Sequence, residues 1–394
     1  MSLNIYDRRE RALVAAADVA LRPIGAIRRA FTASRHAVPQ RILCLRLERI
    51  GDLLMTLPAL AELGALAPDA AIDLVVGSWN VDIAGAIPRI DRIETVDAEW
   101  LARDRTGRPL AGLVRDARRW KSRAYDLALN FEPDIRSNLL LAASGARRLV
   151  GFTSGGGGPL LDLAIDYDTR AHTADNAVRL VRLAFGLADG PVRPGRLEVP
   201  DAARAEASRL VRPLGSGPVI ALHANAGRLV KQWPEERFRA VAATLIAERG
   251  ATIVLTGGPE DRALVASVKA GLLPERLIDV AGIDLVRLAA VLERVSLLVT
   301  CDTGPMHLAH AVGTPVVAVF GPSDPVRYAP RGPLDRIVRI DLPCAPCNRI
   351  RLPPARCTGH TPDCLSGIDA GRVLDAIDGV LGALVTERAT GSSG

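Results

Sequence analysis

Short runs of aliphatic and β-branched residues alternate with helical patterns from residue 41 onward, and this alternation constrains the fold most strongly. In the first half the expected strands are "RILCLRL", "AIDLVVG", "YDLALN" and "RRLVGF", at residues 41–47, 71–77, 125–130 and 147–152. Helical patterns lie between or after them, near 53–67, 110–123, 135–144 and 173–187. Strands that alternate with helices predict an α/β fold with a parallel sheet and right-handed crossovers.

The same alternation restarts in the second half of the chain. Strands are expected at residues 218–223, 251–258, 276–282, 296–302 and 314–321, and helices near 234–249, 259–270, 284–294, 305–312 and 369–386. A chain of 394 residues can bury two separate cores. Ligands usually bind in the cleft between two such domains.

The domain boundaries follow from local composition. The stretch 188–217 is rich in proline and glycine, which indicates a linker. We expect an N-terminal arm at 1–40, a first domain at 41–190 and a linker at 191–217. A second domain at 218–370, which includes a cysteine-rich loop at 344–364, and a C-terminal helix with a tail at 371–394 follow.

Charge and hydropathy exclude several classes of protein. The net charge is +6 and the basic residues are scattered, so nucleic acid is not an expected partner. No apolar run reaches the roughly 20 residues that span a bilayer. The arm lacks a secretory pattern because Asp18 interrupts its apolar segment, so we expect a cytoplasmic protein. The arm reads as an amphipathic basic helix, which either packs on the first domain or contacts an anionic inner membrane face.

A carboxylate follows the first expected strand, in "CLRLERIGDLLMTLPALAEL". Gly51 permits a tight strand-to-helix turn, and Asp52 comes directly after it. The carboxyl end of a parallel strand is where ligands bind, so Asp52 could accept a proton from a substrate hydroxyl in the cleft. The alternative is an ordinary helix N-cap.

Two later strand ends have features of an anion site. The loop "HANAGRLVKQWPEERF" carries Lys231, one of three lysines in the chain, beside Gly227 and the start of a helix. In "VTCDTGPMHLAHAVGTPVVAVFGPSDP", a strand ends at Asp302-Thr303-Gly304 before a helix that Pro305 opens. Backbone amides expected to be free at Thr303, Gly304 and Met306 would bind phosphate together with the helix dipole, and His307 lies in the same first turn. The alternatives are a solvated loop lysine and a packed helix histidine.

These motifs together resemble glycosyltransferase family 9, the heptosyltransferases of lipopolysaccharide core assembly. "DLALNFEPDIRSNLLLAASGARRLVGF" and "TGGPEDRALV" also match, in family order, over about 41–325. The resemblance implies a GT-B fold: two Rossmann-like domains with parallel sheets that face a central cleft, the acceptor on the N-terminal domain and the nucleotide sugar on the C-terminal one. It also implies inverting transfer with no cofactor or metal in catalysis. The arm has no family counterpart, and Ala224 and Ala226 stand in a loop where the family often has hydroxyl residues.

The resemblance assigns roles to individual residues. Asp52 corresponds to the catalytic base, and Lys231 with the amides of Thr303 and Gly304 corresponds to the phosphate site. Asp302 orders that loop or contacts the donor sugar, and His307 belongs to the same site. Glu260 corresponds to a ribose contact. Arg136 either holds an anionic acceptor or is a surface helix arginine.

Four cysteines form a separate cluster, in "CAPCNRIRLPPARCTGHTPDC". Cys344, Cys347, Cys357 and Cys364 have the soft ligands that a structural zinc or iron ion requires, and His360 is an alternative ligand. Free thiols and pairwise disulfides are the other interpretations. Cys44 and Cys301 lie in expected strands and are assigned to the core.

The sequence therefore predicts a glycosyltransferase that moves a sugar, expected to be heptose from an ADP-heptose donor, onto a lipopolysaccharide core or related glycan, with contact to the inner membrane face as an open question. Two alternatives remain: a nucleotide-sugar epimerase-like GT-B enzyme, and a non-catalytic member that binds glycan or a protein partner.

Overall fold

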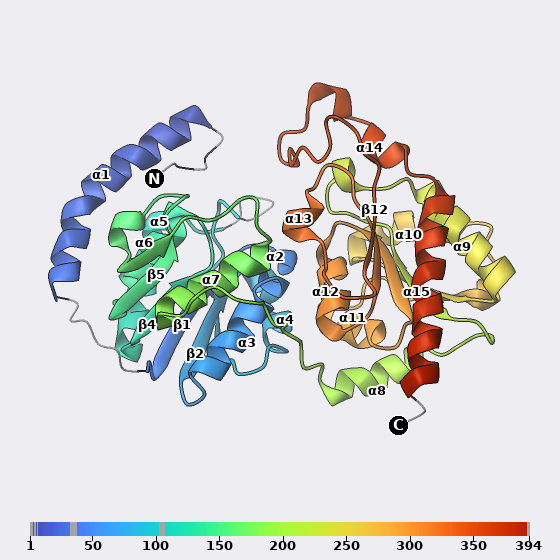
Figure 1. The fold of residues 1–394 in the computed structure, drawn as a ribbon, viewed down its shortest axis with the longest axis horizontal. Helices are drawn as coiled ribbons and strands as arrows, with labels where there is room; N and C mark the ends of the chain where they lie inside the picture. Colours follow the sequence, from blue (N-terminus) through green and yellow to red (C-terminus); the bar gives the residue numbers. More distant parts are fainter. Residues whose placement is uncertain (1–2, 4, 6, 32–37, 102–106, 392–394) are drawn as a thin grey trace. The chain divides into compact units, whose positions relative to one another are not determined.

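The computed structural model describes residues 3, 5, 7–31, 38–101 and 107–391, and the chain divides into two compact units, residues 1–197 and 198–394. Each unit has a six-stranded sheet with helices packed on it (Figure 1). Every strand pairing is parallel. The predicted α/β class is confirmed.

The first sheet has the strand order β3-β2-β1-β4-β5-β6. Its strands are β1 (Arg41–Arg46), β2 (Ala71–Val76), β3 (Arg92–Thr95), β4 (Leu127–Asn130), β5 (Arg148–Phe152) and β6 (Leu163–Ile165). The α-helices of this unit are α1 (Arg8–Phe31), α2 (Ile50–Leu54), α3 (Leu57–Leu66), α4 (Val81–Ala84), α5 (Leu110–Ala117), α6 (Ile135–Ala143) and α7 (Thr173–Phe185). Short 3-10 helices are η1 (Ser78–Asn80), η2 (Arg118–Arg123) and η3 (Gly158–Leu160).

The second sheet repeats this topology, with the order β12-β11-β10-β7-β8-β9. Its strands are β7 (Val219–His223), β8 (Thr252–Thr256), β9 (Leu277–Asp279), β10 (Leu297–Cys301), β11 (Val316–Val319) and β12 (Arg336–Val338). The α-helices are α8 (Asp201–Leu210), α9 (Glu235–Arg249), α10 (Arg262–Lys269), α11 (Leu285–Leu292), α12 (Gly304–Val312), α13 (Pro325–Tyr328), α14 (Asp363–Ser366) and α15 (Ala370–Gly391). The 3-10 helices are η4 (Leu229–Lys231), η5 (Pro259–Asp261), η6 (Pro274–Arg276) and η7 (Ala355–Cys357).

The strand order reverses once in each sheet. The reversal falls between β1 and β4 in the first unit and between β7 and β10 in the second. The crossover connections leave these two strands in opposite directions, so a crevice opens beyond their carboxyl ends, and ligands of open α/β sheets bind there. The four loops that follow β1, β4, β7 and β10 are therefore the loops from which a site is built.

Several details differ from the sequence prediction. The helix expected at 53–67 is two helices, α2 and α3, with Pro58 in the first turn of α3. The edge strands β3, β6 and β12 have no predicted counterpart, and α8 lies within the residues predicted as linker. Among the described helices, none has the length and apolar character needed to cross a bilayer.

Buried side chains hold the sheets together. Cys44 in β1 and Cys301 in β10 are both 0% exposed, so their assignment to the core is confirmed. The core of the first unit also contains a polar network at the carboxyl end of β4. Asn138 of α6 is 0% exposed; it donates to the carbonyls of Phe152 at 3.1 Å and Gly156 at 2.8 Å, and accepts a bond from Asn130 at 2.8 Å.

We expect Asn138→Ala to lower the free energy of unfolding by about 2–4 kcal/mol, because two buried carbonyls and the amide of Asn130 lose a partner. Urea denaturation measures the change. Ser208→Ala, at an exposed position of α8, is the control and should change stability by less than about 0.5 kcal/mol. A loss for Asn138→Ala as small as that of the control would contradict the role given to this network.

Candidate active site

Asp52 lies just beyond the carboxyl end of β1, as the third residue of α2, and its side chain is 30% exposed. The residue that precedes α2 is Arg49, which makes no side-chain capping bond. Asp52 is therefore inside the first turn and is not the N-cap, so the capping alternative is wrong. A half-exposed carboxylate at this edge can meet a substrate and exchange a proton with it.

A buried arginine holds the Asp52 turn. Arg46, the last residue of β1, is 2% exposed, and its Nη2 lies 3.4 Å from Oδ1 of Asp52. Its Nε donates to the backbone carbonyl of Asp52 at 3.2 Å, and its Nη1 donates to the carbonyl of Phe131 at 2.6 Å. One guanidinium thus joins the ends of β1 and β4 to the α2 turn, and a planar fork of donors is suited to that task.

A second buried group, Glu132, holds the same turn from the β4 side. Its Oε1 accepts hydrogen bonds from the backbone amides of Leu47 and, at 2.9 Å, of Glu48. Burial raises the pKa of Glu132 to about 8, and repulsion from the Glu48 carboxylate adds to this effect. Sequence reasoning missed both Arg46 and Glu132. The available signal was the carboxylate in "NFEP", directly after an expected central strand.

Arg136 lies nearby in the first turn of α6, but its charge is already partnered. Its Nη2 is 2.5 Å from Oδ2 of Asp134, which is also the N-cap of α6. The guanidinium stacks over the ring of Trp100 at 5.0 Å, and one third of the side chain is exposed. An acceptor anion at Arg136 would therefore compete with Asp134.

In the second unit, the loops after β7 and β10 meet through an ion pair. Nζ of Lys231 lies 3.0 Å from Oδ2 of Asp302, and the two side chains are 18% and 10% exposed. Burial raises the pKa of Asp302, but the Lys231 ammonium, a hydrogen bond from Ser323 and the nearby His307 together bring it below its ordinary value. Asp302 is therefore an anion at neutral pH, and it orients the lysine. Ser323 lies in the "FGPSDP" turn after β11.

The N-terminus of α12 supplies backbone donors beside this pair. Thr303 precedes α12 in an extended conformation and makes no side-chain capping bond. Among the described residues, no hydrogen bond has the backbone amide of Thr303 or Gly304 as its donor, so both amides are free, as the sequence predicts. The expectation for Met306 is wrong, because its amide donates to the carbonyl of Thr303 at 3.2 Å and closes the first turn. His307 lies in this turn and is 7% exposed.

The loop after β8 carries Glu260 and a neighbour that the sequence prediction overlooked. Glu260 is exposed, whereas Asp261 is 8% exposed and accepts bonds from Nδ2 of Asn225 at 2.8 Å and from the amide of Gly258 at 2.7 Å. Asp261 therefore ties the β8 loop to the loop that leads to Lys231. Glu260 is left at the surface, where it can reach a ligand.

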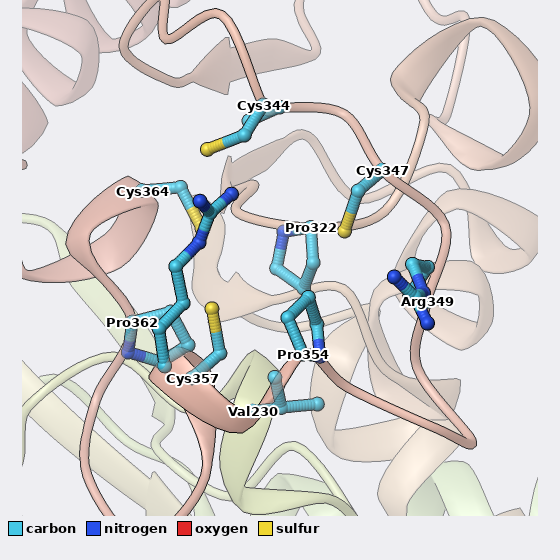
Figure 2. A pocket seen from close by; sticks show the side chains of 11 residues that line it. Val230, Pro322, Cys344, Cys347, Arg349, Pro354, Cys357, Pro362 and Cys364 are labelled. Atoms are coloured by element: carbon cyan, nitrogen blue, oxygen red, sulfur yellow. The ribbon is translucent and has the colours of Figure 1, made fainter.

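The four clustered cysteines line one small pocket together with Val230, Pro322 and Pro354 (Figure 2). Cys364 is buried, and burial with the neighbouring thiols raises its pKa to about 11. All six cysteines are free thiols. In the described part of the chain, however, no three His, Cys, Asp or Glu side chains are arranged to hold a metal ion. The proximity of the thiols agrees with the sequence prediction, but the structural zinc or iron ion is not supported.

Two Rossmann-like units, each with a six-stranded parallel sheet, are the architecture of the GT-B class of glycosyltransferases. Similar solved structures include a family 9 glycosyltransferase from Veillonella parvula, with a TM-score of 0.73 and 26% identity over 87% of this chain and 97% of that one. Escherichia coli ADP-heptose lipopolysaccharide heptosyltransferase II has a TM-score of 0.70 and 22% identity, over 86% of this chain and 98% of that one.

Sequence comparison identifies the family. The model of glycosyltransferase family 9 (heptosyltransferase) matches residues 114–353, which is more than half of the chain. Lipopolysaccharide heptosyltransferase 1 of Pseudomonas aeruginosa is 28% identical over 329 residues, which cover 78% of this chain and 86% of that protein. The chain therefore belongs to glycosyltransferase family 9, as the sequence motifs predicted, and it is a glycosyltransferase of the heptosyltransferase family.

Glu132→Gln provides a test of the buried carboxyl group. The folded state keeps the Glu132 proton up to a pH of about 8, whereas the unfolded chain releases it near the ordinary value of 4.5. The free energy of unfolding should therefore fall as pH rises between these values, by at most about 1.4 kcal/mol per pH unit from this group. Glutamine keeps the acceptor oxygen and cannot ionise, so the variant should have a flatter profile.

Urea denaturation across this pH range measures the two profiles. Glu248→Gln is the matched control, because Glu248 is 66% exposed, and its profile should follow the wild type. Parallel slopes for Glu132→Gln and wild type would contradict the raised pKa.

Proposed function

We propose that this enzyme transfers heptose from an ADP-heptose donor to a lipopolysaccharide-core or related glycan acceptor, with inversion at the anomeric carbon. The family and the printed name of the Escherichia coli relative, an ADP-heptose heptosyltransferase, support the donor. The observation that carries the proposal is the location of Asp52 and of the Lys231–Asp302 pair. Each lies beyond the carboxyl end of a strand at the point where its sheet reverses order.

In this proposal residues 41–190 form the acceptor-side domain and 218–370 the nucleotide-sugar domain, joined by a linker within 191–217. The Asp52 carboxylate removes the proton from an acceptor hydroxyl. The resulting oxygen attacks the anomeric carbon from the face opposite the leaving group, and the bond from that carbon to the diphosphate oxygen breaks. One carboxylate is sufficient as the base, because the reaction has a single displacement at the anomeric carbon.

Negative charge develops on the departing nucleoside diphosphate, and the second unit offers groups to stabilise it. The Lys231 ammonium and the amides of Thr303 and Gly304 at the start of α12 would bind the phosphates, with His307 beside them. Asp302 acts through Lys231, since it fixes the direction of the ammonium. Exposed Glu260 is the proposed ribose contact. These groups supply the charge stabilisation, and no step of the proposal passes through a metal ion.

Arg136 is the proposed acceptor contact, and its guanidinium stacks over the ring of Trp100 at 5.0 Å. An anionic acceptor group would replace Asp134 as its partner. We further propose that the acceptor is linked to lipid and that the protein works at the cytoplasmic face of the inner membrane.

Asp52→Asn tests the base. Asparagine keeps the size of the side chain and cannot accept the proton, so kcat should fall by about 10²–10⁴-fold while ADP affinity stays within about twofold. The measurement is ADP release from ADP-heptose in the presence of a lipopolysaccharide-core acceptor. Asp69→Asn, an exposed residue at the amino end of β2, is the control and should keep wild-type activity. Full activity of Asp52→Asn would remove the proposed base.

Lys231→Ala tests the donor site. Loss of the ammonium also leaves Asp302 close to the phosphates without its cationic partner, so the affinity for ADP should fall by about 10–100-fold. Isothermal titration calorimetry with ADP measures the change, and thermal unfolding checks the fold. Lys269→Ala is a matched control, because Lys269 pairs with Asp279 at 2.7 Å in the same unit. Equal affinity of Lys231→Ala and wild type would contradict the assignment.

A further inference from the structure

Helix α1 (Arg8–Phe31) is attached to the first unit by one face, which packs on η3. Val14 is 8% exposed, and Oδ1 of Asp18 accepts the backbone amide of Gly157 at 2.6 Å. Near the other end, Nη2 of Arg28 lies 2.5 Å from Oδ2 of Asp162. Figure 1 shows the helix lying along the side of this unit. The helix is therefore a fixed part of the unit.

The opposite face of α1 is apolar and exposed. Leu13, Val19, Ile24 and Ile27 are 72%, 57%, 55% and 62% exposed. Exposed Pro23 and five exposed alanines, at residues 12, 15, 16, 20 and 26, occupy the intervening positions on the same half of the helix. We call this surface the outer face of α1. Soluble proteins rarely leave so many large apolar side chains uncovered on one element, so such a surface marks a docking site.

Most exposed charges around the outer face are positive, although Asp7 and Glu10 are also exposed near the start of the helix. Arg8, Arg9 and Arg11 are exposed at the start of the helix, and Arg22 is exposed further along. The only acidic residue between positions 12 and 27 is Asp18, and it is used on the inner face. Glu10 is close enough to Arg136 to raise the pKa of that guanidinium, together with Asp134.

We propose that the outer face of α1 docks on a bilayer surface that contains anionic lipids. An in-plane helix places apolar side chains among the acyl chains and arginines among the lipid phosphates, which matches this distribution. A second copy of the chain is a poorer occupant. It would bring the same exposed arginines toward each other, with only the exposed carboxylates of Asp7 and Glu10 on this segment to neutralise them.

The docked helix connects to the edge of the sheet that carries the active site. Asp18 binds the turn that contains Gly155, Gly156 and Gly157, and the carbonyl of Gly155 accepts the amide of Ile135, the first residue of α6. Asn138 of α6 donates to Gly156 at 2.8 Å. Through these contacts a membrane-bound α1 would hold the start of α6, and with it Arg136, at a constant position relative to the lipid surface. The proposal does not depend on which sugar is transferred.

The test is co-sedimentation of the full chain with vesicles of phosphatidylcholine, with and without phosphatidylglycerol. We expect the wild type to bind the vesicles that contain phosphatidylglycerol. Leu13→Glu with Ile27→Glu should reduce the bound fraction at least about tenfold, because two carboxylates enter the apolar face. The matched control is Leu352→Glu with Val385→Glu, at residues that are 77% and 69% exposed elsewhere in the chain.

The control adds the same charge at equally exposed positions, so it should bind within about twofold of the wild type. Failure of the wild type to bind the anionic vesicles, or an equal loss in both variants, would overturn the proposal. A concentration-dependent dimer in light scattering that only the α1 variant abolishes would assign the face to a second copy and would also overturn it. If the glutamate variant unfolds early on heating, Leu13→Ser with Ile27→Ser replaces it under the same criteria.

Asp52→Asn separates this proposal from the proposed function. That variant should bind vesicles as the wild type does, whatever its activity. Vesicle binding with no transferase activity in the wild type would leave the docking surface intact and would refute only the proposed reaction.

Discussion

The point at which strand order reverses in each sheet is the constraint on which the rest of the structure depends. Parallel strands place all their carboxyl ends on one edge, and crossovers that leave in opposite directions open that edge only between the central pair. The chain uses this point twice, at β1 and β4 and again at β7 and β10. Asp52 and Glu132 follow the first pair, and Lys231 and Asp302 follow the second. The candidate site residues are thus grouped by topology before any side-chain contact is formed.

Buried charge then gives each group its geometry. Arg46 is removed from water, and three of its hydrogen bonds go to the carbonyls of Asp52 and Phe131 and to the Asp52 carboxylate. Removal of one partner from such a group is costly, so the turn is restricted to one arrangement. Lys231 and Asp302 follow the same logic in the second unit. In both cases a residue that need not touch substrate directs one that is proposed to do so.

The sequence was sufficient for most of the central strands, because continuous apolar runs of β-branched residues mark buried parallel strands. It was insufficient for β3, β6 and β12, whose three or four residues are mostly half-exposed and lack such runs. Asp52 could be found because a Gly-Asp pair interrupts apolar sequence at a strand end. Arg46 and Glu132 could not, since their role depends on a contact between chain positions 85 residues apart. The spacing of the cysteines predicted correctly that their thiols lie close together. The metal site inferred from the same spacing is not supported, because spacing along the chain does not fix the geometry of the ligands.

The central claim is that one carboxylate, Asp52, drives a single displacement at the anomeric carbon. The most direct measurement is the anomeric configuration of the transferred sugar, read by nuclear magnetic resonance from the product of an ADP-heptose reaction. We expect a configuration opposite to that of the donor. Retention of configuration would require two successive displacements and a nucleophile on the enzyme, and it would contradict the account.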